Sequence, residues 1–347
     1  MIEFLKLGWR IFASNFWSLS QPYKITFAIT YNCNSRCKTC NIWKKKSTNE
    51  LTTREIKKIF KNINPSWVNL TGGEPFLRRD IFDIAKIIRD NTDTYLLNMT
   101  TNGLLGDLAF KDIKKITNLG FPKFIVVVSL DGPEKIHDYI RGIKGNWKKS
   151  IELYKKLRKL SKEKRNFETY LGYTASTYNI GQFSKTLEEA KKEIPTLKIR
   201  DFHLNFYHES EVYFDNKKLS RLNKNFLIDL KKTIDAFKSK KIGFNPISFL
   251  EFKYLSLIDN YLKTKTSPLP CKALQSSCYI DPHGNVYPCT IFNTIIGNLR
   301  DSNYDLKKNW NSEKAKKIRK LIKQNKCPGC WTPCEAYQTI LGNLLKK

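Results

Sequence analysis

The sequence predicts an α/β fold in which parallel strands alternate with helices. Three observations support this fold class. Short segments of β-branched or alternating apolar residues recur six times over residues 24–207, and helix-like stretches separate them. A polar motif directly follows each of the first four segments. Because ligands of α/β folds bind at the carboxyl ends of the strands, we expect the four motifs to lie on one rim.

Local patterns place the individual elements. The apolar patterns predict strands at 24–31, 67–70, 95–100, 124–130, 170–177 and 202–207. Amphipathic spacing predicts helices at 52–60, 79–89, 107–116, 148–160 and 182–194. The first of these helices opens with Thr52-x-x-Glu55, which is close to a capping box. Beyond residue 215 or so, we expect helices at 219–239 and 248–263, and then a hairpin whose loop is 281–285.

The composition is that of a globular protein. The chain has 347 residues, 41% of them hydrophobic, which excludes a disordered or disulfide-stapled mini-protein. No apolar run approaches the ~18 residues of a membrane-spanning helix. The N-terminal segment carries Lys6 and Arg10 and lacks a small-residue cleavage site. We therefore expect a cytoplasmic protein.

The charge is strongly basic, with 62 Lys and Arg against 32 Asp and Glu, a net +30. The basic residues are densest at 144–165 and 307–326, and both stretches have the pattern of amphipathic helices. Two interpretations are open. The excess is either a solvated lysine-rich surface or an attraction to a polyanion such as RNA, anionic lipid or a phosphorylated substrate.

The segment before the first strand has its own pattern. Leu5, Trp9, Phe12, Phe16 and Leu19 follow helical spacing. Such a helix either packs its apolar side on the rest of the fold or lies in a membrane interface. The second interpretation predicts peripheral membrane contact and places a lipid among the possible substrates.

The nine cysteines form two groups with a long gap between them. They are Cys33, Cys37, Cys40, Cys271, Cys278, Cys289, Cys327, Cys330 and Cys334. An odd number in tight groups without a secretory signal argues against disulfides and favours metal binding. The first group offers three thiolates and no nearby histidine, whereas structural zinc takes four ligands. Three thiolates suit a [4Fe-4S] cluster with one iron open to a substrate or cofactor.

These motifs resemble those of the radical S-adenosylmethionine (radical SAM) enzymes. Cys33-x3-Cys37-x2-Cys40 after a first strand is similar to the family signature, and Gly72-Gly73-Glu74-Pro75 is similar to its second motif. The cysteines from Cys271 onward resemble the C-terminal auxiliary iron–sulfur domain called SPASM, or twitch in its shorter form. The resemblance implies a partial (β/α)6 TIM-like barrel of parallel strands plus a small Cys-rich domain.

The resemblance also implies a chemistry. Cys33, Cys37 and Cys40 would hold a [4Fe-4S] cluster that cleaves SAM reductively, and the resulting 5′-deoxyadenosyl radical would abstract hydrogen from a substrate. The SAM contacts implied by the resemblance are Gly72, Gly73, Glu74, Ser129 and Arg141. Thr101 and Asn102 either line the site or close a turn. Thr39 stands where the family usually has an aromatic residue, so Trp43 is an alternative neighbour for the adenine. No catalytic residue is assigned.

Six cysteines remain for the C-terminal domain, too few for two fully ligated clusters. We expect one auxiliary [4Fe-4S] cluster held by Cys271, Cys289 and two of Cys327, Cys330 and Cys334. Cys278 fits a buried position in a strand. Two clusters with three cysteines each, or a structural zinc, are the alternatives.

The expected organisation has four parts: an N-terminal extension at 1–23, the radical SAM barrel at 24–215, a helical connection at 216–264 and the auxiliary domain at 265–347. The resemblance favours an oxidoreductase or transferase that modifies a peptide or protein or matures a cofactor. An electron donor such as ferredoxin or flavodoxin is the implied partner. Because the segment before the first strand is short for a peptide-recognition domain, small-molecule or lipid biosynthesis is the alternative. A non-catalytic metal scaffold that contacts RNA is a further one.

Overall fold

The computed structural model describes residues 2–216, 224–240 and 246–345. Six parallel strands form its centre: β1 Lys24–Thr30, β2 Trp67–Gly72, β3 Leu96–Thr101, β4 Lys123–Ser129, β5 Phe167–Ala175 and β6 Phe202–Phe206. They lie in the order β6-β5-β4-β3-β2-β1, and every neighbouring pair is parallel. The α/β class and the partial barrel predicted above are thus confirmed.

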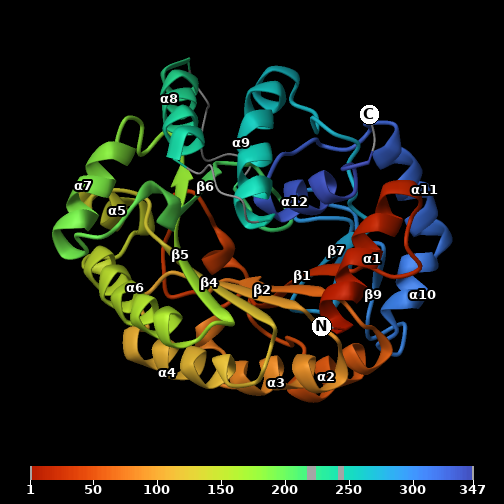
Figure 1. Ribbon diagram of the computed structural model, residues 1–347. Coiled ribbons are helices and arrows are strands. Elements are labelled where there is room, and N and C mark those ends of the chain that lie inside the picture. The colour runs from red at the N-terminus through yellow and green to blue at the C-terminus, as the bar shows by residue number, and fades with distance from the viewer. Residues whose placement is uncertain (1, 217–223, 241–245, 346–347) are drawn as a thin grey trace.

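Helices cover the outer side of this curved sheet (Figure 1). They are α2 Thr53–Asn62, α3 Ile81–Asn91, α4 Gly106–Thr117, α5 Glu134–Arg141, α6 Asn146–Glu163 and α7 Phe183–Glu193, with short 3-10 turns at Ile42–Lys44, Pro75–Leu77 and Ile199–Asp201. The capping box expected at the start of α2 is present, since the Thr52 and Glu55 side chains each bond the other's backbone N–H. The apolar side of α2, with Ile56, Ile59 and Phe60, is buried against the sheet.

The remaining elements are the N-terminal helix and the helices and strands of the C-terminal part of the chain. They are α1 Ile2–Phe16, α8 Lys224–Lys240, α9 Pro246–Thr264, β7 Ser277–Ile280, β8 Asn285–Tyr287, β9 Gly297–Asn298, α10 Leu306–Asn311, α11 Glu313–Lys323 and α12 Pro333–Leu341. Part of the helix expected at 219–239 lies outside the described residues. Figure 1 shows α9 and α12 on the inner side of the sheet, opposite α2 and α3.

The C-terminal strands continue the barrel sheet. β7 pairs in parallel with β1, and β8 and β9 follow as antiparallel strands. Cys278 lies in β7 opposite Ile25 and is completely buried. The small domain is therefore attached to the barrel through the strand that precedes Cys33.

The inner face of the sheet is more accessible than the outer face. On β5 every second residue is partly exposed while the residues between are buried, and β6 shows the same alternation. Neighbouring side chains on a strand point to opposite faces, so the covering helices bury one set and the barrel interior exposes the other. The exposed set is largely polar: Asn98, Thr100, Tyr170, Thr174, His203 and Asn205. A polar and partly exposed interior of this kind can bind a polar molecule, whereas a tightly packed apolar core could not.

One of these inward side chains is held rigidly. The His203 Nδ1 lies 2.5 Å from Glu251 Oε1 in α9, and the hydroxyl of Tyr337 in α12 donates to the same oxygen. The Tyr170 ring packs against the imidazole, with the two ring centroids 4.3 Å apart. Two C-terminal helices thus fix a histidine inside the barrel.

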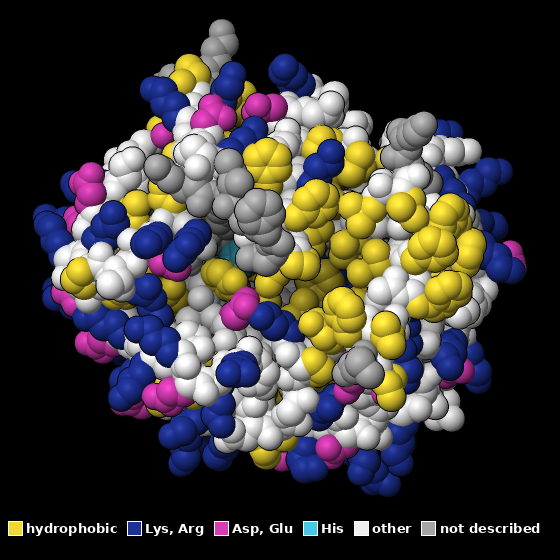
Figure 2. Space-filling view, in the orientation of Figure 1, with side chains coloured by type: hydrophobic (Ala, Val, Ile, Leu, Met, Phe, Trp, Pro, Cys, Tyr) yellow, Lys and Arg dark blue, Asp and Glu magenta, His cyan; other side chains and the backbone are white. Residues whose placement is uncertain are grey.

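Apolar side chains are concentrated on one part of the surface. Figure 2 shows apolar side chains gathered over the part of this face where Figure 1 places α1 and α12. No helix in the described part of the chain is long and apolar enough to cross a membrane.

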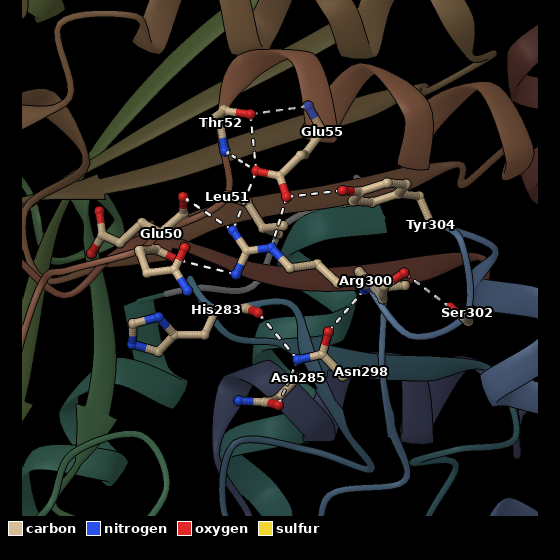
Figure 3. Close-up of polar contacts among 12 residues, drawn as sticks. Glu50, Leu51, Thr52, Glu55, His283, Asn285, Asn298, Arg300, Ser302 and Tyr304 are labelled. Carbon is tan, nitrogen blue, oxygen red and sulfur yellow. Dashed lines mark hydrogen bonds and ion pairs between the residues drawn. The ribbon is translucent and has the colours of Figure 1, made fainter.

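A polar clamp joins the C-terminal domain to the barrel (Figure 3). Arg300 follows β9, and its Nε lies 2.7 Å from Glu55 Oε1 at the start of α2. Its guanidinium also donates to the carbonyls of Asn49 and Glu50, and the Tyr304 hydroxyl donates to Glu55. The bond from Arg300 is the main cause that lowers the pKa of Glu55 to about 2.

Replacing Arg300 with alanine is expected to lower the free energy of unfolding by about 1–2 kcal/mol, because a half-buried carboxylate loses a charged donor. The difference in the free energy of unfolding between wild type and variant should be largest above pH 4.5. It should disappear as the pH falls toward 2, since Glu55 becomes protonated in that range. Urea denaturation at several pH values measures it. Lys316→Ala, which breaks an exposed pair with Glu313, is the control and should change little. A pH-independent loss in Arg300→Ala would contradict the assigned role of the pair.

Candidate functional site

The first three cysteines lie in the loop that follows β1. The loop is fixed to the end of α5, because Arg36 and Lys38 donate backbone hydrogen bonds to the carbonyls of Arg141 and Ile140. Gly142 makes this contact possible: its φ is +68°, and a Cβ there would lie 2.5 Å from the carbonyl oxygen of Arg36. The turn after α5 therefore shapes the cysteine loop.

The three thiols lie in a setting that disfavours free thiolates. Burial is the main cause that raises the pKa of Cys33 to about 11 and of Cys40 to about 12, and the nearby Cys37 raises both further. Burial also raises the pKa of Cys37. Such a group gains most from a positively charged metal partner, which must displace the protons to bind. The backbone N–H of Ile42 already donates to the Cys40 sulfur, a contact typical of cluster ligands.

The three thiols are compatible with an iron–sulfur cluster. No group of three or more His, Cys, Asp or Glu in the described ranges converges on one metal-ion position. A [4Fe-4S] cluster does not require this convergence, because each thiolate binds a different iron. The donor set of Cys33, Cys37 and Cys40 therefore fits the cluster that the resemblance implies.

Arg141 and Asp131 form a buried ion pair next to the cysteines. One guanidinium nitrogen lies 2.6 Å from Asp131 Oδ2, and another lies 3.8 Å from the Cys37 sulfur. The Nε of Arg141 is buried and has no partner within the described part of the chain. An unpaired buried donor is costly, so this N–H is suited to an anionic or carbonyl group of a ligand.

The Gly72-Gly73-Glu74 motif connects three strand ends. A Cβ on Gly72 would lie 2.2 Å from the Thr30 carbonyl oxygen, and a Cβ on Gly73 would lie equally close to that of Asn32. The two glycines are thus required by the contact between the end of β2 and the cysteine loop, beyond any approach to a ligand. Glu74 follows them and is almost completely buried.

Glu74 bonds to the end of β3. Its carboxylate accepts hydrogen bonds from the Thr101 hydroxyl at 2.9 Å and from the Asn102 backbone N–H at 2.7 Å. The Asn102 side chain in turn donates to Asn34 and lies 4.0 Å from the Cys33 sulfur. Thr101 and Asn102 therefore belong to the same site. The sequence does not predict a role for Asn34, because an isolated loop asparagine matches no motif.

Ser129 and Trp43 lie at the edges of this site. Ser129 ends β4 and pairs with Gly172 in β5, so it lies on the rim that carries the other motifs. The Trp43 ring is covered by the guanidinium of Arg36, 4.9 Å from its centroid.

Four of the C-terminal cysteines line a single pocket: Cys271, Cys289, Cys327 and Cys330, together with Ser267, Ile291, Phe292 and Gly329. Gly329 forms the turn between Cys327 and Cys330. Its φ is +72°, and the carbonyl of Lys265 leaves no room for a Cβ. Backbone N–H groups donate to the Cys271 and Cys289 sulfurs. Burial is the main cause that raises the pKa of Cys271 to about 12. Four thiols around one pocket match the ligand number of a closed [4Fe-4S] cluster.

Cys334 is not among the residues that line this pocket. It is the second residue of α12, and the charge of Lys24 in β1 opposes the effect of burial on its pKa. Lys24 also donates to the Cys334 carbonyl. Of the three cysteines left open by the sequence, the structure thus brings Cys327 and Cys330 to Cys271 and Cys289.

Comparisons with known proteins agree with this arrangement. Residues 27–190 match the radical SAM superfamily, and residues 271–335 match the iron–sulfur cluster-binding SPASM domain. The chain is 26% identical to the AdoMet-dependent heme synthase of Methanosarcina barkeri, over 92% of this chain and 90% of that protein. It is 36% identical to a probable GTP 3′,8-cyclase of Saccharolobus islandicus, over 25% of this chain and 30% of that protein.

Solved structures show the same fold. A structure of anSMEcpe with bound AdoMet and a peptide superimposes with a TM-score of 0.62 and 18% identity, over 86% of this chain and 83% of that one. SuiB of Streptococcus suis bound to S-adenosylmethionine gives 0.61 and 16%, over 95% and 75%. The first family match contains the first cysteine group, and the second match contains the other. The chain therefore belongs to the radical SAM superfamily and carries a C-terminal SPASM domain.

Proposed function

We propose that Cys33, Cys37 and Cys40 hold the radical SAM cluster and that Glu74 and Arg141 position SAM beside it. The strongest support is that four segments meet at one place through direct hydrogen bonds. They are the cysteine loop, the end of β2, the loop that follows β3 and the end of α5. The bound cluster would supply one electron for cleavage of SAM. The residues of the chain orient the cofactor and hold its charges.

The charged ends of SAM have matching partners. Glu74 offers a buried carboxylate for an ammonium group, and Arg141 offers an unpaired Nε–H for a carboxylate. Asp131 holds Arg141 in place, and its other oxygen accepts the backbone N–H of Thr174. The cluster loop and the SAM contacts are therefore fixed by one hydrogen-bonded network.

The substrate is proposed to enter the barrel interior. We favour the maturation of a cofactor, since the heme synthase of M. barkeri matches over nearly the whole length of both chains. Peptide or protein modification is the other branch of this proposal, and small-molecule or lipid biosynthesis is its alternative. The polar inward side chains, such as Asn98, His203 and Asn205, offer hydrogen bonds to a substrate with hydroxyl, amide or carboxylate groups. A ferredoxin or flavodoxin is proposed as the electron donor.

The experiment is anaerobic reconstitution with iron and sulfide, reduction with dithionite and addition of SAM. The proposal predicts release of 5′-deoxyadenosine and methionine in equal amounts. Absence of both products from a fully reconstituted protein would refute it.

The affinity for SAM should depend on pH through Glu74. Burial raises the pKa of Glu74 to about 7, so the carboxyl is neutral below that pH and charged above it. Because the ammonium group of SAM prefers the charged form, we expect the affinity to rise about fivefold between about pH 6 and pH 7, below the range in which an α-amino group itself loses its proton. Equilibrium binding of SAM to the reconstituted protein measures it.

Glu74→Gln should remove this slope. Glu335→Gln is the matched control, because Glu335 is also buried with a pKa of about 7 and lies in α12. A Glu74→Gln protein with the wild-type slope would show that another group causes it.

A further inference from the structure

Helix α1 presents its apolar side to solvent. Ile2, Leu5, Trp9, Phe12 and Phe16 are spaced by three or four residues and form one stripe, and each is between 45% and 63% exposed. A surface helix normally buries such a stripe against the core. Contiguous exposed apolar surface of this kind marks an interaction site.

The opposite side of α1 faces the rest of the molecule and is held to it by polar contacts. Arg10 donates to the Asn64 carbonyl at 2.5 Å and to the Ser66 hydroxyl at 2.7 Å, and Lys6 pairs with Asp93 at 2.6 Å. Lys272 donates to the Ser14 carbonyl at 2.6 Å. These bonds fix the orientation of the helix, so the exposure of the stripe is built into the fold. Lys6 and Arg10 thus attach the helix to the barrel.

The apolar surface extends past the helix. Trp9, Phe12, Phe16 and Trp17 form a continuous row of rings, with neighbouring centroids 5.8, 5.1 and 5.8 Å apart. Leu345 is 57% exposed and lies close to the end of α1, because its backbone N–H donates to the Asn15 side chain. In Figure 2 the apolar patch spreads over this side of the molecule, with Lys and Arg around it.

The surrounding charge selects the occupant. α10 contacts the chain just after α1, through bonds from Trp310 to the Leu19 carbonyl and from Asn311 to that of Ser20. α11 follows directly and carries six Lys or Arg and one Glu among its 11 residues. A second copy of the chain would bring the same net +30 and be repelled. An anionic lipid surface complements the charge and also accepts Trp and Phe at the headgroup level.

We propose that α1 docks on an anionic lipid bilayer. The helix, about 22 Å long at 1.5 Å per residue, lies parallel to the surface with its aromatic row among the headgroups. The basic helix α11 adds long-range attraction. This inference names a partner for the enzyme and does not depend on the chemistry proposed above.

The test is cosedimentation of the full chain with vesicles of phosphatidylcholine alone or mixed with phosphatidylglycerol. We expect binding to the anionic vesicles to be about tenfold or more tighter, and to weaken with salt as the screening length falls from ~10 Å at 0.1 M to ~3 Å at 1 M. The double variant Trp9→Ser/Phe16→Ser should bind anionic vesicles about tenfold more weakly.

The control is Leu108→Ser/Ile228→Ser, which removes two equally exposed apolar side chains from α4 and α8. It should bind like wild type, and all proteins should cleave SAM equally without vesicles, which separates this inference from the proposed chemistry. Equal vesicle binding by both double variants, or no binding by wild type, would overturn the proposal. A self-associating wild type that becomes monomeric in Trp9→Ser/Phe16→Ser would assign the stripe to a second copy instead.

Discussion

Replacing any one of Cys33, Cys37 or Cys40 with alanine is expected to abolish SAM cleavage. Each thiolate would bind a different iron of the cluster, so losing one removes a covalent ligand. The other two cysteines would already be in use, and the neighbouring carboxylates of Asp131 and Glu74 are engaged by other partners. The measurement is 5′-deoxyadenosine released by the reconstituted, reduced variants, with a loss of about a thousandfold or more expected because the activity requires an intact cluster.

Cys278→Ala is the matched control for this series. Cys278 is completely buried in β7 and belongs to neither set of proposed cluster ligands. Its replacement should therefore leave SAM cleavage near the wild-type rate and cause a small loss of stability. The three loop variants should keep the circular dichroism of the folded barrel. Wild-type cleavage by any of them would remove that cysteine from the ligand set.

Replacing Cys327 with alanine is expected to remove the auxiliary cluster, whereas replacing Cys334 should not. Cys327 lines the pocket together with Cys271, Cys289 and Cys330, while Cys334 lies beside Lys24. Wild type should hold about eight irons per chain, Cys327→Ala about four and Cys334→Ala about eight. Iron and sulfide analysis after reconstitution measures them.

The combined Cys33, Cys37 and Cys40 variant completes this experiment. It should retain about four irons, all in the auxiliary cluster. About eight irons in that variant would indicate two auxiliary clusters, and one zinc with no iron would refute the auxiliary iron–sulfur site. Loss of iron from Cys334→Ala but not from Cys327→Ala would reverse the ligand assignment.

The sequence predicts the barrel well because its signals are local. β1 is a short β-branched run and α2 opens with a capping box, so both are recognised from adjacent residues. The pattern does not predict the helix that carries Arg141: α5 has only eight residues, mostly polar, and its end packs against the cysteine loop. Short helices of this kind are stabilised by tertiary contacts and leave a weak pattern.

The site shows the same limit. Motifs identify Glu74 and the cysteines, but no pattern places Asn34 beside Asn102, because that contact depends on two loops meeting in space. The separation of Cys334 from Cys327 and Cys330 also depends on where α12 begins. For α1, periodicity detects the apolar stripe but not which side faces the barrel, since that is decided by partners such as Asn64 and Asp93 far along the chain.

The most direct test of the central claim is electron paramagnetic resonance of the reduced protein with and without SAM. Three thiolates on four irons would leave one iron of the proposed Cys33–Cys40 cluster open, whereas four thiolates would close the proposed auxiliary cluster. The account predicts that SAM changes the signal of one cluster only, that Cys327→Ala retains this change, and that Cys33→Ala loses it. Signals that SAM leaves unchanged in wild type, or a SAM-dependent change that persists in Cys33→Ala, would contradict it.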